Sequence, residues 1–288
     1  MTASIAPHRA SPARRALTRE VEVHGPWSLA VSRRFWEDFS PNRLVDQQGE
    51  GLDAVFLGDA DWRPVRIRIE QVPGGARLRA EGDGDLESAV AQAMRFMAID
   101  VDGTAWPEVG RRDAVVAEVQ QALPGFRPCG FFSPFEAAAW TVLSQRVRMT
   151  QASVLKRRIA DELGEDGAFP GPAVLRGRDL GLPGRKGEYL DAVCEAALDG
   201  VFDGARLRAL NADEAMRQVQ QVTGIGPFAA GLVVVRGANH PDALPAHEPR
   251  LEAEVARRYG AGTALAAVAE AWRPFRTWAA VGLRALAP

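Results

Sequence analysis

The first part of the chain alternates hydrophobic and polar residues with the period of two that is typical of β-strands. In VRIRIEQ, the apolar side chains of Val65, Ile67 and Ile69 fall on one face, and charged or polar side chains alternate with them. A Pro-Gly-Gly turn at residues 73–75 joins this segment to ARLRAEG, and VEVHG, WSLAVS and GLDAVFLG precede it. We therefore predict that this region is rich in strands and forms a small antiparallel sheet with one face exposed to solvent.

The pattern changes to helical periodicity at DLESAVAQAMRFMAI. Leu86, Val90, Met94 and Met97 recur there at helical spacing, so this segment can cover the apolar face of the sheet. The rest of the chain is almost entirely helical in pattern. Turns that contain Gly or Pro separate predicted helices at residues 109–123, 134–162, 186–199, 204–221, 227–236, 249–259, 263–272 and 275–286.

These patterns predict an α+β fold, in which a small N-terminal antiparallel sheet domain with a helix precedes an all-helical domain. The chain has 288 residues, which suits two domains, and we place them at residues 18–108 and 109–288. Residues 1–17 contain Arg15 and other arginines among Ala, Ser and Pro, without the apolar core of a secretory signal. They predict a disordered basic tail.

Composition and charge exclude several classes of function. Hydrophobic residues make up 47% of the chain, but it has no run of about 18 apolar residues that would cross a membrane. A formal net charge of −2 argues against indiscriminate coating of nucleic acid and still permits a local basic surface. Cys129 and Cys194 cannot supply the four thiolates of an iron–sulfur cluster, and they form no zinc-binding spacing with the four histidines. No metal or other cofactor is expected.

One predicted helix has a well-marked start and a basic far end. Ser133-Pro134-Phe135-Glu136 combines a capping serine, a proline at the first helical position and a glutamate three residues after the cap. The apolar residues that follow are expected to pack in the core. Beyond them, no acidic residue occurs between positions 146 and 158, whereas this stretch contains Arg146, Arg148, Lys156, Arg157 and Arg158. Such a run is either a solvated helix face or a place where a phosphate backbone is held.

The sequence VTGIGPFAAGLVVVRG contains a short glycine turn directly before a predicted helix. Gly224 and Gly226 flank Ile225, and the helix then opens with proline. Glycines permit positive φ and a close approach of a nucleic-acid backbone, while free N–H groups and the helix dipole favour an anion. Many Gly-x-Gly turns between helices are only turns. The amphipathic segment NADEAMRQVQQV directly before it supplies the first helix of a hairpin, which favours a phosphate site.

Four motifs in this order resemble those of the helix-hairpin-helix DNA glycosylase superfamily, particularly 3-methyladenine DNA glycosylase II. SPFEAAAWTVLSQRV is similar to the family's helix that ends in Gln-x-Val-Ser, and GLPGRKGEYL to its Gly-Leu-Ser-x-x-Lys-x-x-Tyr-Leu stretch. VTGIGPFAA resembles its Leu-Pro-Gly-Ile-Gly-Pro-Trp-Thr-Ala hairpin, and WRPFRTWAA its Trp-x-Pro-Trp-Arg-x-x-Ala. With a fainter likeness in the sheet region, the resemblance covers residues 20–286.

The resemblance implies a DNA repair enzyme that flips a damaged base out of duplex DNA and hydrolyses its glycosidic bond. A carboxylate then stabilises the positive charge that develops on the sugar. The family's carboxylate is an aspartate within Phe-Pro-x-x-Asp, and LPAHEPRL places Glu248 at that position. The added methylene displaces the carboxylate, and a misplacement of about 1 Å can cost about 10²-fold in rate. Alternatively, Glu248 is only a helix-start residue before Pro249, where the helix dipole favours a negative charge.

Further departures from the family pattern fall around the same inferred site. Lyase members carry lysine where this chain has Phe228, which implies a monofunctional enzyme, and this aromatic side chain either stacks on a base or packs in the core. Arg284 stands where the family commonly has a pocket tryptophan, so a cationic alkylated purine would be repelled. Arg146 falls at the position of the side chain that fills the gap left by the flipped base. The resemblance further implies that Trp140 lines the base pocket.

The inferred DNA-contacting residues come from three segments. They are Gly224, Ile225, Gly226, Arg146, Arg148 and Lys186. The expected partner is double-stranded DNA with damaged or modified bases, bound by a monomeric cytoplasmic protein associated with the nucleoid. A catalytically weak or inactive protein of the same fold that recognises distorted DNA is the main alternative, and a fold retained for a different substrate is a third.

Overall fold

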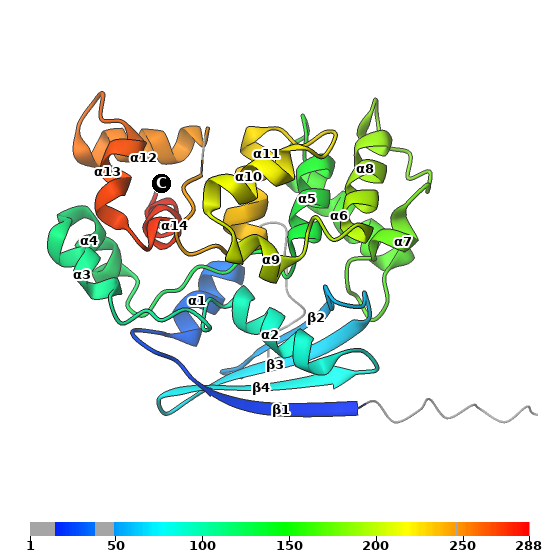
Figure 1. Cartoon of the computed structure of the whole chain (residues 1–288), viewed down its shortest axis with the longest axis horizontal. Coiled ribbons are helices and arrows are strands. Elements are labelled where there is room, and N and C mark those ends of the chain that lie inside the picture. The colour runs from blue at the N-terminus through cyan, green and yellow to red at the C-terminus, as the bar shows by residue number, and fades with distance from the viewer. Residues whose placement is uncertain (1–14, 38–48, 246, 288) are drawn as a thin grey trace, which may run out of the picture.

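A computed structural model describes residues 15–37, 49–245 and 247–287, and it shows a small sheet below a larger body of helices (Figure 1). The sheet has four antiparallel strands in the order β1-β4-β3-β2. The strands are β1 Arg15–Glu22, β2 Leu52–Leu57, β3 Pro64–Val72 and β4 Gly75–Gly82. The chain therefore has the predicted α+β architecture with an N-terminal antiparallel sheet.

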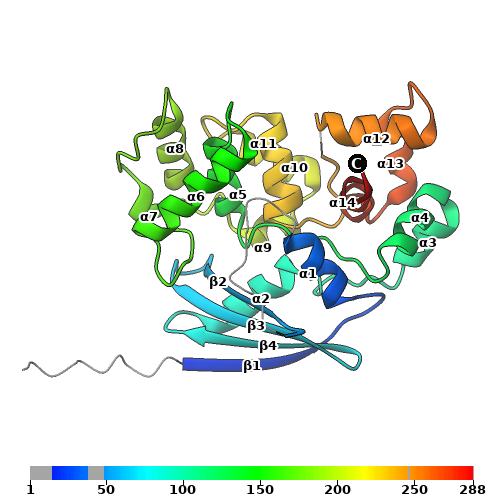
Figure 2. The ribbon, with the colours of Figure 1, turned by 180° about the vertical axis from the view of Figure 1, so that it is seen from behind.

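The alternating pattern of β3 sets which face of the sheet is buried. Val65, Ile67 and Ile69 are at most 1% exposed and form the floor of a hydrophobic core. Helices α1 Leu29–Glu37 and α2 Leu86–Phe96 contribute to the same core and cover this face (Figure 2). The predicted exposed face and covering helix are thus both confirmed.

The first helix and the first strand differ from the predictions. WSLAVS was expected to be strand-rich, but Leu29–Glu37 forms helix α1, because Leu29, Ser32 and Trp36 recur at helical spacing and are all buried. The predicted tail at residues 1–17 is too long by three residues, since β1 begins at Arg15 and pairs along β4. Residues 1–14 lie outside the described part of the chain.

Three predicted helices are each divided into two. The predicted helix at 204–221 consists of α9 Gly204–Ala209 and α10 Ala212–Gln220, because the side chain of Asn211 accepts a hydrogen bond from the backbone N–H of Asp213 and so starts a new helix. The predicted helix at 134–162 is interrupted by residues 144–148, where Arg146 adopts a positive φ of 54°. The predicted helix at 109–123 divides at Asp113, whose side chain accepts hydrogen bonds from the backbone N–H groups of Val115 and Val116 and so starts a new helix. Apolar periodicity runs through these breaks, so the pattern alone did not show them.

The helices form two groups with separate hydrophobic cores. One core contains residues of α5 Pro134–Leu143, α6 Met149–Leu163, α7 Pro172–Leu175, α8 Lys186–Leu198, α9 Gly204–Ala209, α10 Ala212–Gln220, α11 Pro227–Leu232 and the π-helical η1 Val233–Gly237. The other contains residues of α3 Trp106–Arg112, α4 Ala114–Ala122, α12 Pro249–Tyr259, α13 Leu265–Ala269, the 3₁₀ helix η2 Glu270–Trp272 and α14 Arg276–Leu286. Helices α3 and α4 therefore share a core with the far end of the chain.

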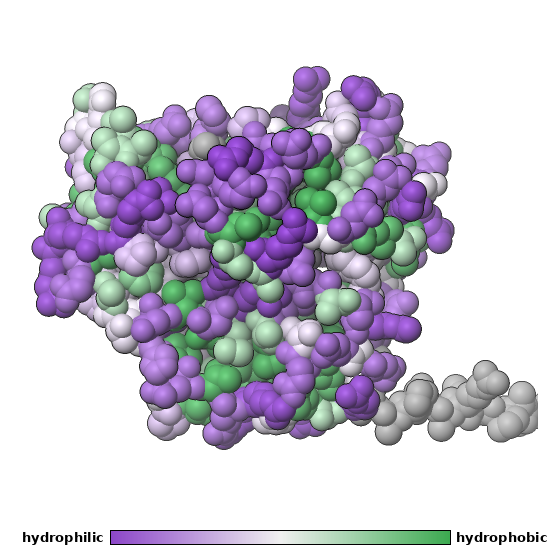
Figure 3. All heavy atoms as spheres, viewed as in Figure 1, coloured by the Kyte–Doolittle hydropathy of each residue, from purple (hydrophilic) through white to green (hydrophobic). Residues whose placement is uncertain are grey.

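The surface in Figure 3 is mostly hydrophilic, and its hydrophobic residues form scattered patches over the helices and the sheet. Among the described helices, none is long and apolar enough to span a membrane.

Candidate active site

A cavity of about 350 Å³ lies where α14 and the segment before α12 face α11 and η1. The side chain of Phe35 on α1 closes part of it. Its lining is mainly apolar, with one carboxylate and two guanidinium groups, and it comprises Phe35, Phe228, Gly231, Leu232, Val235, Arg236, Pro245, Glu248, Ala280, Val281, Arg284 and Ala285. Three residues that the sequence singled out, Glu248, Phe228 and Arg284, therefore line one cavity.

Glu248 both directly precedes a helix and lines this cavity. It is the N-cap of α12, and its Oε2 accepts a hydrogen bond of 2.6 Å from the backbone N–H of Leu251. The same Oε2 lies 3.1 Å from Nε of Arg284. The helix N-terminus and the guanidinium group both stabilise the ionised carboxylate at the wall of the cavity.

Phe228 stands at the mouth of the cavity with 49% of its surface exposed. It follows Pro227, the first residue of α11, so the start of this helix directs an aromatic ring toward solvent. Core packing, the alternative for this position, is therefore wrong. Trp140 differs from its prediction, because it is 3% exposed in the helical core beside Phe131 and does not line the cavity. Its position in the middle of the buried helix α5 gives it a packing role.

The glycine turn connects α10 to α11 as the sequence indicated. Gly224 has φ +92°, and a side chain there would collide with the ring of Tyr189. Gly226 has φ −87° and an open position where a Cβ would meet nothing within 4 Å. Among the described residues, none accepts a hydrogen bond from the backbone N–H of Gly226, which is exposed.

Ile225, between the two glycines, is directed inward. Its side chain is 5% exposed in the helical core, and its backbone N–H donates to the carbonyl of Val222. Ile225 therefore anchors the turn to the core, and neither its side chain nor its N–H is directed to a DNA partner.

Arg146 lies beside this turn. It occupies the break between α5 and α6, is exposed and has φ +54°. Its neighbour Gln145 donates from Nε2 to the carbonyl of Gly224 at 3.2 Å, which joins the two turns. Arg148 is also exposed and occupies the N-cap position of α6, where its backbone N–H donates to Oε1 of Gln151. The structure thus brings two predicted arginines and the glycine turn to the same side of the helical body.

Lys186 does not belong to that surface. It is 7% exposed, and its Nζ donates to the carbonyl of Leu143 at the end of α5 with a distance of 2.9 Å. Burial lowers the pKa of this amine. Lys186 therefore holds α8 against α5, which corrects the prediction of a DNA contact.

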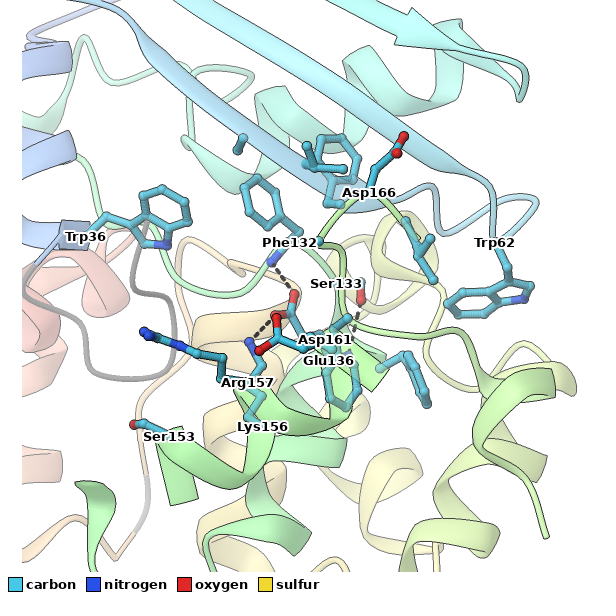
Figure 4. Close-up of a pocket in the computed structure, with 18 of the residues that line it drawn as sticks. Trp36, Trp62, Phe132, Ser133, Glu136, Ser153, Lys156, Arg157, Asp161 and Asp166 are labelled. Carbon is cyan, nitrogen blue, oxygen red and sulfur yellow. Dashed lines mark hydrogen bonds and ion pairs between the residues drawn. The ribbon is translucent and has the colours of Figure 1, made fainter. Parts of the chain in front are cut away.

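Lys156 belongs to the predicted basic run, but it is buried and does not add to a basic surface. Its Nζ forms a buried ion pair of 2.5 Å with Glu136, and Figure 4 shows the two side chains directed toward one another. Lys156 and Arg157 both line a second cavity, which lies between α6 and strand β2. Because α6 turns this part of its surface toward the sheet, the basic run does not form one continuous face.

Arg236 and Phe35 are cavity residues that the sequence did not single out. Arg236 donates from Nη2 to the carbonyl of Cys129 at 2.7 Å, and its guanidinium group lies 5.0 Å from the centre of the Phe35 ring. Burial lowers its pKa to about 10, so it stays charged at neutral pH. The sequence signal that could have indicated Arg236 is VVVRG, in which one arginine follows an apolar run.

The described residues contain no group of three or more His, Cys, Asp or Glu side chains that could hold a metal ion. Cys129 and Cys194 are buried free thiols, and burial raises the pKa of each to about 12.

No protein-family model matches the chain. It is 26% identical over 257 residues to DNA-3-methyladenine glycosylase 2 of Escherichia coli, which covers 82% of this chain and 86% of that protein. It is 25% identical over 173 residues to DNA-3-methyladenine glycosylase of Bacillus subtilis, which covers 55% of this chain and 57% of that protein. The chain thus spans little more than half the length of this second relative.

A solved structure shares the fold over almost its whole length. The 3-methyladenine DNA-glycosylase from Archaeoglobus fulgidus superposes with a TM-score of 0.71 at 17% identity, over 92% of this chain and 96% of that one. The two relatives and this solved structure are all named as 3-methyladenine DNA glycosylases. In sequence and fold, the chain resembles the helix-hairpin-helix DNA glycosylase superfamily, and within it 3-methyladenine DNA glycosylase II.

Proposed function

We propose that the protein is a monofunctional DNA glycosylase that hydrolyses the N-glycosidic bond of a modified base flipped out of duplex DNA. One observation carries this proposal: Glu248, Phe228 and Arg284 line one cavity that is small enough for a single base. Water adds to the sugar, the bond to the base breaks, and the products are a free base and an abasic site. The protein acts as a monomer, with its helical domain as the helix-hairpin-helix core.

Glu248 supplies the carboxylate in this proposal. As the bond to the base breaks, positive charge develops on the sugar, and a fixed carboxylate next to the cavity stabilises that charge. The cap to Leu251 and the pair with Arg284 hold the group in place before the reaction. Both contacts use Oε2. Within the described part of the chain, Oε1 keeps no hydrogen bond and can face the sugar.

Phe228 supports hydrolysis without a lyase step. A Schiff base requires an amine, and a phenyl ring stands at the family's lysine position. The exposed ring can instead stack on the flipped base.

Duplex DNA is proposed to bind across the two linked turns. The exposed backbone at Gly226 offers an N–H group to a phosphate, and the exposed side chains of Arg146 and Arg148 add positive charge nearby. Arg146 is proposed to enter the gap that the flipped base leaves.

Incubation with duplexes that each carry one modified base, followed by heating in alkali, tests the proposed activity. An abasic site breaks under this treatment, so strand breaks at the position of the lesion are the expected result. Binding to these duplexes without any break would instead favour a protein that recognises distorted DNA without cleaving it, a function that the exchange of the family's aspartate for Glu248 would permit.

A further inference from the structure

The cavity offers a cationic base little negative charge. Arg284 and Arg236 both line it, and Glu248 is the one carboxylate among its described lining residues. Glu248 already lies 3.1 Å from Arg284. Its charge is therefore largely offset before a base enters. A base that alkylation has made positive would meet a guanidinium group in a partly desolvated space, where repulsion is stronger than in water.

The same cavity offers hydrogen-bond donors to a neutral base. Nε of Arg284 is directed to Glu248, and within the described part of the chain its Nη1 and Nη2 groups make no hydrogen bond. A guanidinium group is a planar fork of donors that matches two neighbouring acceptors, as when arginine pairs with O6 and N7 of guanine. Bonds from a charged donor to a carbonyl oxygen are stronger than those from a neutral donor.

The remaining lining restricts the ligand to a flat, mostly apolar body. Phe228 and Phe35 supply aromatic rings, and Leu232, Val235 and Val281 supply aliphatic wall. At about 350 Å³, the volume is near the lower end of the range of about 300–1,000 Å³ for ligand pockets. A single base with acceptors on its edge fits both the volume and the donors.

We propose that this cavity selects neutral bases to which deamination or oxidation has added a carbonyl oxygen, over bases that alkylation has made cationic, and that Arg284 determines this selectivity. The inference rests on the glycosylase function proposed above. Arg284 contributes to this selectivity in two ways: its free donors bind the added oxygen, and its charge disfavours a cation.

The test compares duplexes of one sequence that contain hypoxanthine, 8-oxoguanine or 7-methylguanine. Hypoxanthine and 8-oxoguanine are neutral and carry an added carbonyl oxygen, whereas 7-methylguanine is cationic. Base release is measured under single-turnover conditions for the wild type and for Arg284→Gln. Arg79→Gln is the matched control, because Arg79 is an exposed arginine on strand β4, where it pairs with Glu81. Affinity is measured in parallel with 2′-fluoro forms of the same lesions, which resist hydrolysis.

The wild type should release at least one neutral base 10-fold or more faster than 7-methylguanine. Arg284→Gln should reduce this ratio at least 10-fold, and Arg79→Gln should leave it unchanged. An unchanged ratio in Arg284→Gln, even with all rates lowered, would show that Arg284 only positions Glu248 and would overturn the proposal. Preference of the wild type for 7-methylguanine would also overturn it.

A protein that lacks the proposed glycosylase activity would give a different result. In that case the wild type releases none of the bases, and the affinities decide the question of selectivity. Tighter binding of the neutral lesions that is lost in Arg284→Gln would support the proposed selectivity of the cavity. Equal affinities for all three lesions would reject it.

Discussion

Glu248 illustrates how one side chain satisfies a local and a functional requirement at once. Its carboxylate caps α12 through Leu251 and pairs with Arg284 at the wall of the cavity. The two explanations considered from the sequence, a helix-start residue and a catalytic carboxylate, are therefore compatible in this geometry. Arg146 shows a different feature at this scale, because a residue other than glycine at φ +54° is uncommon and such strain is often found at functional sites.

Replacing Arg146 by alanine tests its role in the gap beside a flipped base. We expect Arg146→Ala to lose the preference for a mismatched or abasic site over matched duplex, because the side chain that fills the gap is gone. The exposed position makes unfolding an improbable cause. Affinities for the two DNAs, measured by titration at one salt concentration, check this. An equal loss on both would make Arg146 a phosphate contact only.

At the scale of elements, the turn between α10 and α11 contains one glycine that the fold requires and one that is available for binding. Gly224 is required by the fold, since it has φ +92° and contacts the Tyr189 ring, whereas Gly226 has open space where a side chain would begin. The two glycines of one motif therefore have different tasks.

We expect Gly226→Val to fold normally and to bind duplex DNA more weakly at low salt, because the new side chain stands between the backbone N–H and a phosphate. Gly224→Val should instead lower the free energy of unfolding, because its Cβ would overlap Tyr189. Urea denaturation and DNA titration of both variants check this. Unchanged DNA binding by a folded Gly226→Val variant would remove the turn from the proposed interface.

A buried carboxylate stabilises helix α12 through hydrogen bonds with two arginines of the same helix. Glu254 is 3% exposed and accepts hydrogen bonds from Arg257 and Arg258, which lower its pKa to about 2. A glutamate in the unfolded chain has a pKa of about 4.3. Because the folded pKa is the lower one, the stabilisation is complete above about pH 4.3 and is lost as the pH falls toward 2.

Glu254→Gln should therefore lower the free energy of unfolding at pH 7 by up to about 3 kcal/mol, and the difference from the wild type should shrink below about pH 4. Urea denaturation at pH 7, 5, 4 and 3 measures this, with Glu252→Gln as a control, because Glu252 is an exposed carboxylate on the same helix. A difference that does not change with pH would contradict the assigned cause.

Elements with a local sequence pattern were predicted, whereas features that depend on tertiary contacts were not. Strict alternation in β3 and the marked starts of α5 and α12 predicted these elements, because each pattern is local. WSLAVS was assigned to the wrong state because six residues contain too few turns to show the helical spacing of Leu29, Ser32 and Trp36. Lys156 and Lys186 were predicted on a surface, but their partners, Glu136 and the Leu143 carbonyl, come from α5. Such tertiary partners leave no local signal.

The cavity itself was predicted only through motif resemblance. Glu248, Phe228 and Arg284 come from three separate segments, and no spacing rule brings them together. Arg236 was missed because an arginine after an apolar run has no single interpretation in sequence. Trp140 was assigned to the pocket on the resemblance, yet α5 is buried on all sides.

At the scale of the whole molecule, one buried arginine joins the sheet region to the C-terminal helices. Arg127 is 0% exposed and donates to the carbonyls of Pro26, Ala98 and Val101, and its guanidinium group lies 5.0 Å from the centre of the Trp278 ring on α14. It also contacts the carbonyl of His24. Burial lowers its pKa to about 10, so it remains charged at neutral pH.

Arg127→Met should lower the free energy of unfolding by about 3 kcal/mol or more, because several buried carbonyls lose their donor. The exposed Arg79→Met is the matched control and should change stability by about 0.5 kcal/mol or less. Urea denaturation of both variants is the measurement. A similarly small effect of Arg127→Met would show that the junction does not depend on this side chain.

In the proposed reaction, Glu248 stabilises the positive charge that develops on the sugar. The most direct test of this role is the single-turnover rate of base release by Glu248→Gln, which keeps the shape of the side chain and removes its charge. We expect a fall of about 10²-fold or more, with DNA binding kept or strengthened. Glu248→Asp, which restores the family residue, should retain release or increase it. An unchanged rate in Glu248→Gln would show that the charge of Glu248 has no part in the reaction and that this residue is only the cap of α12.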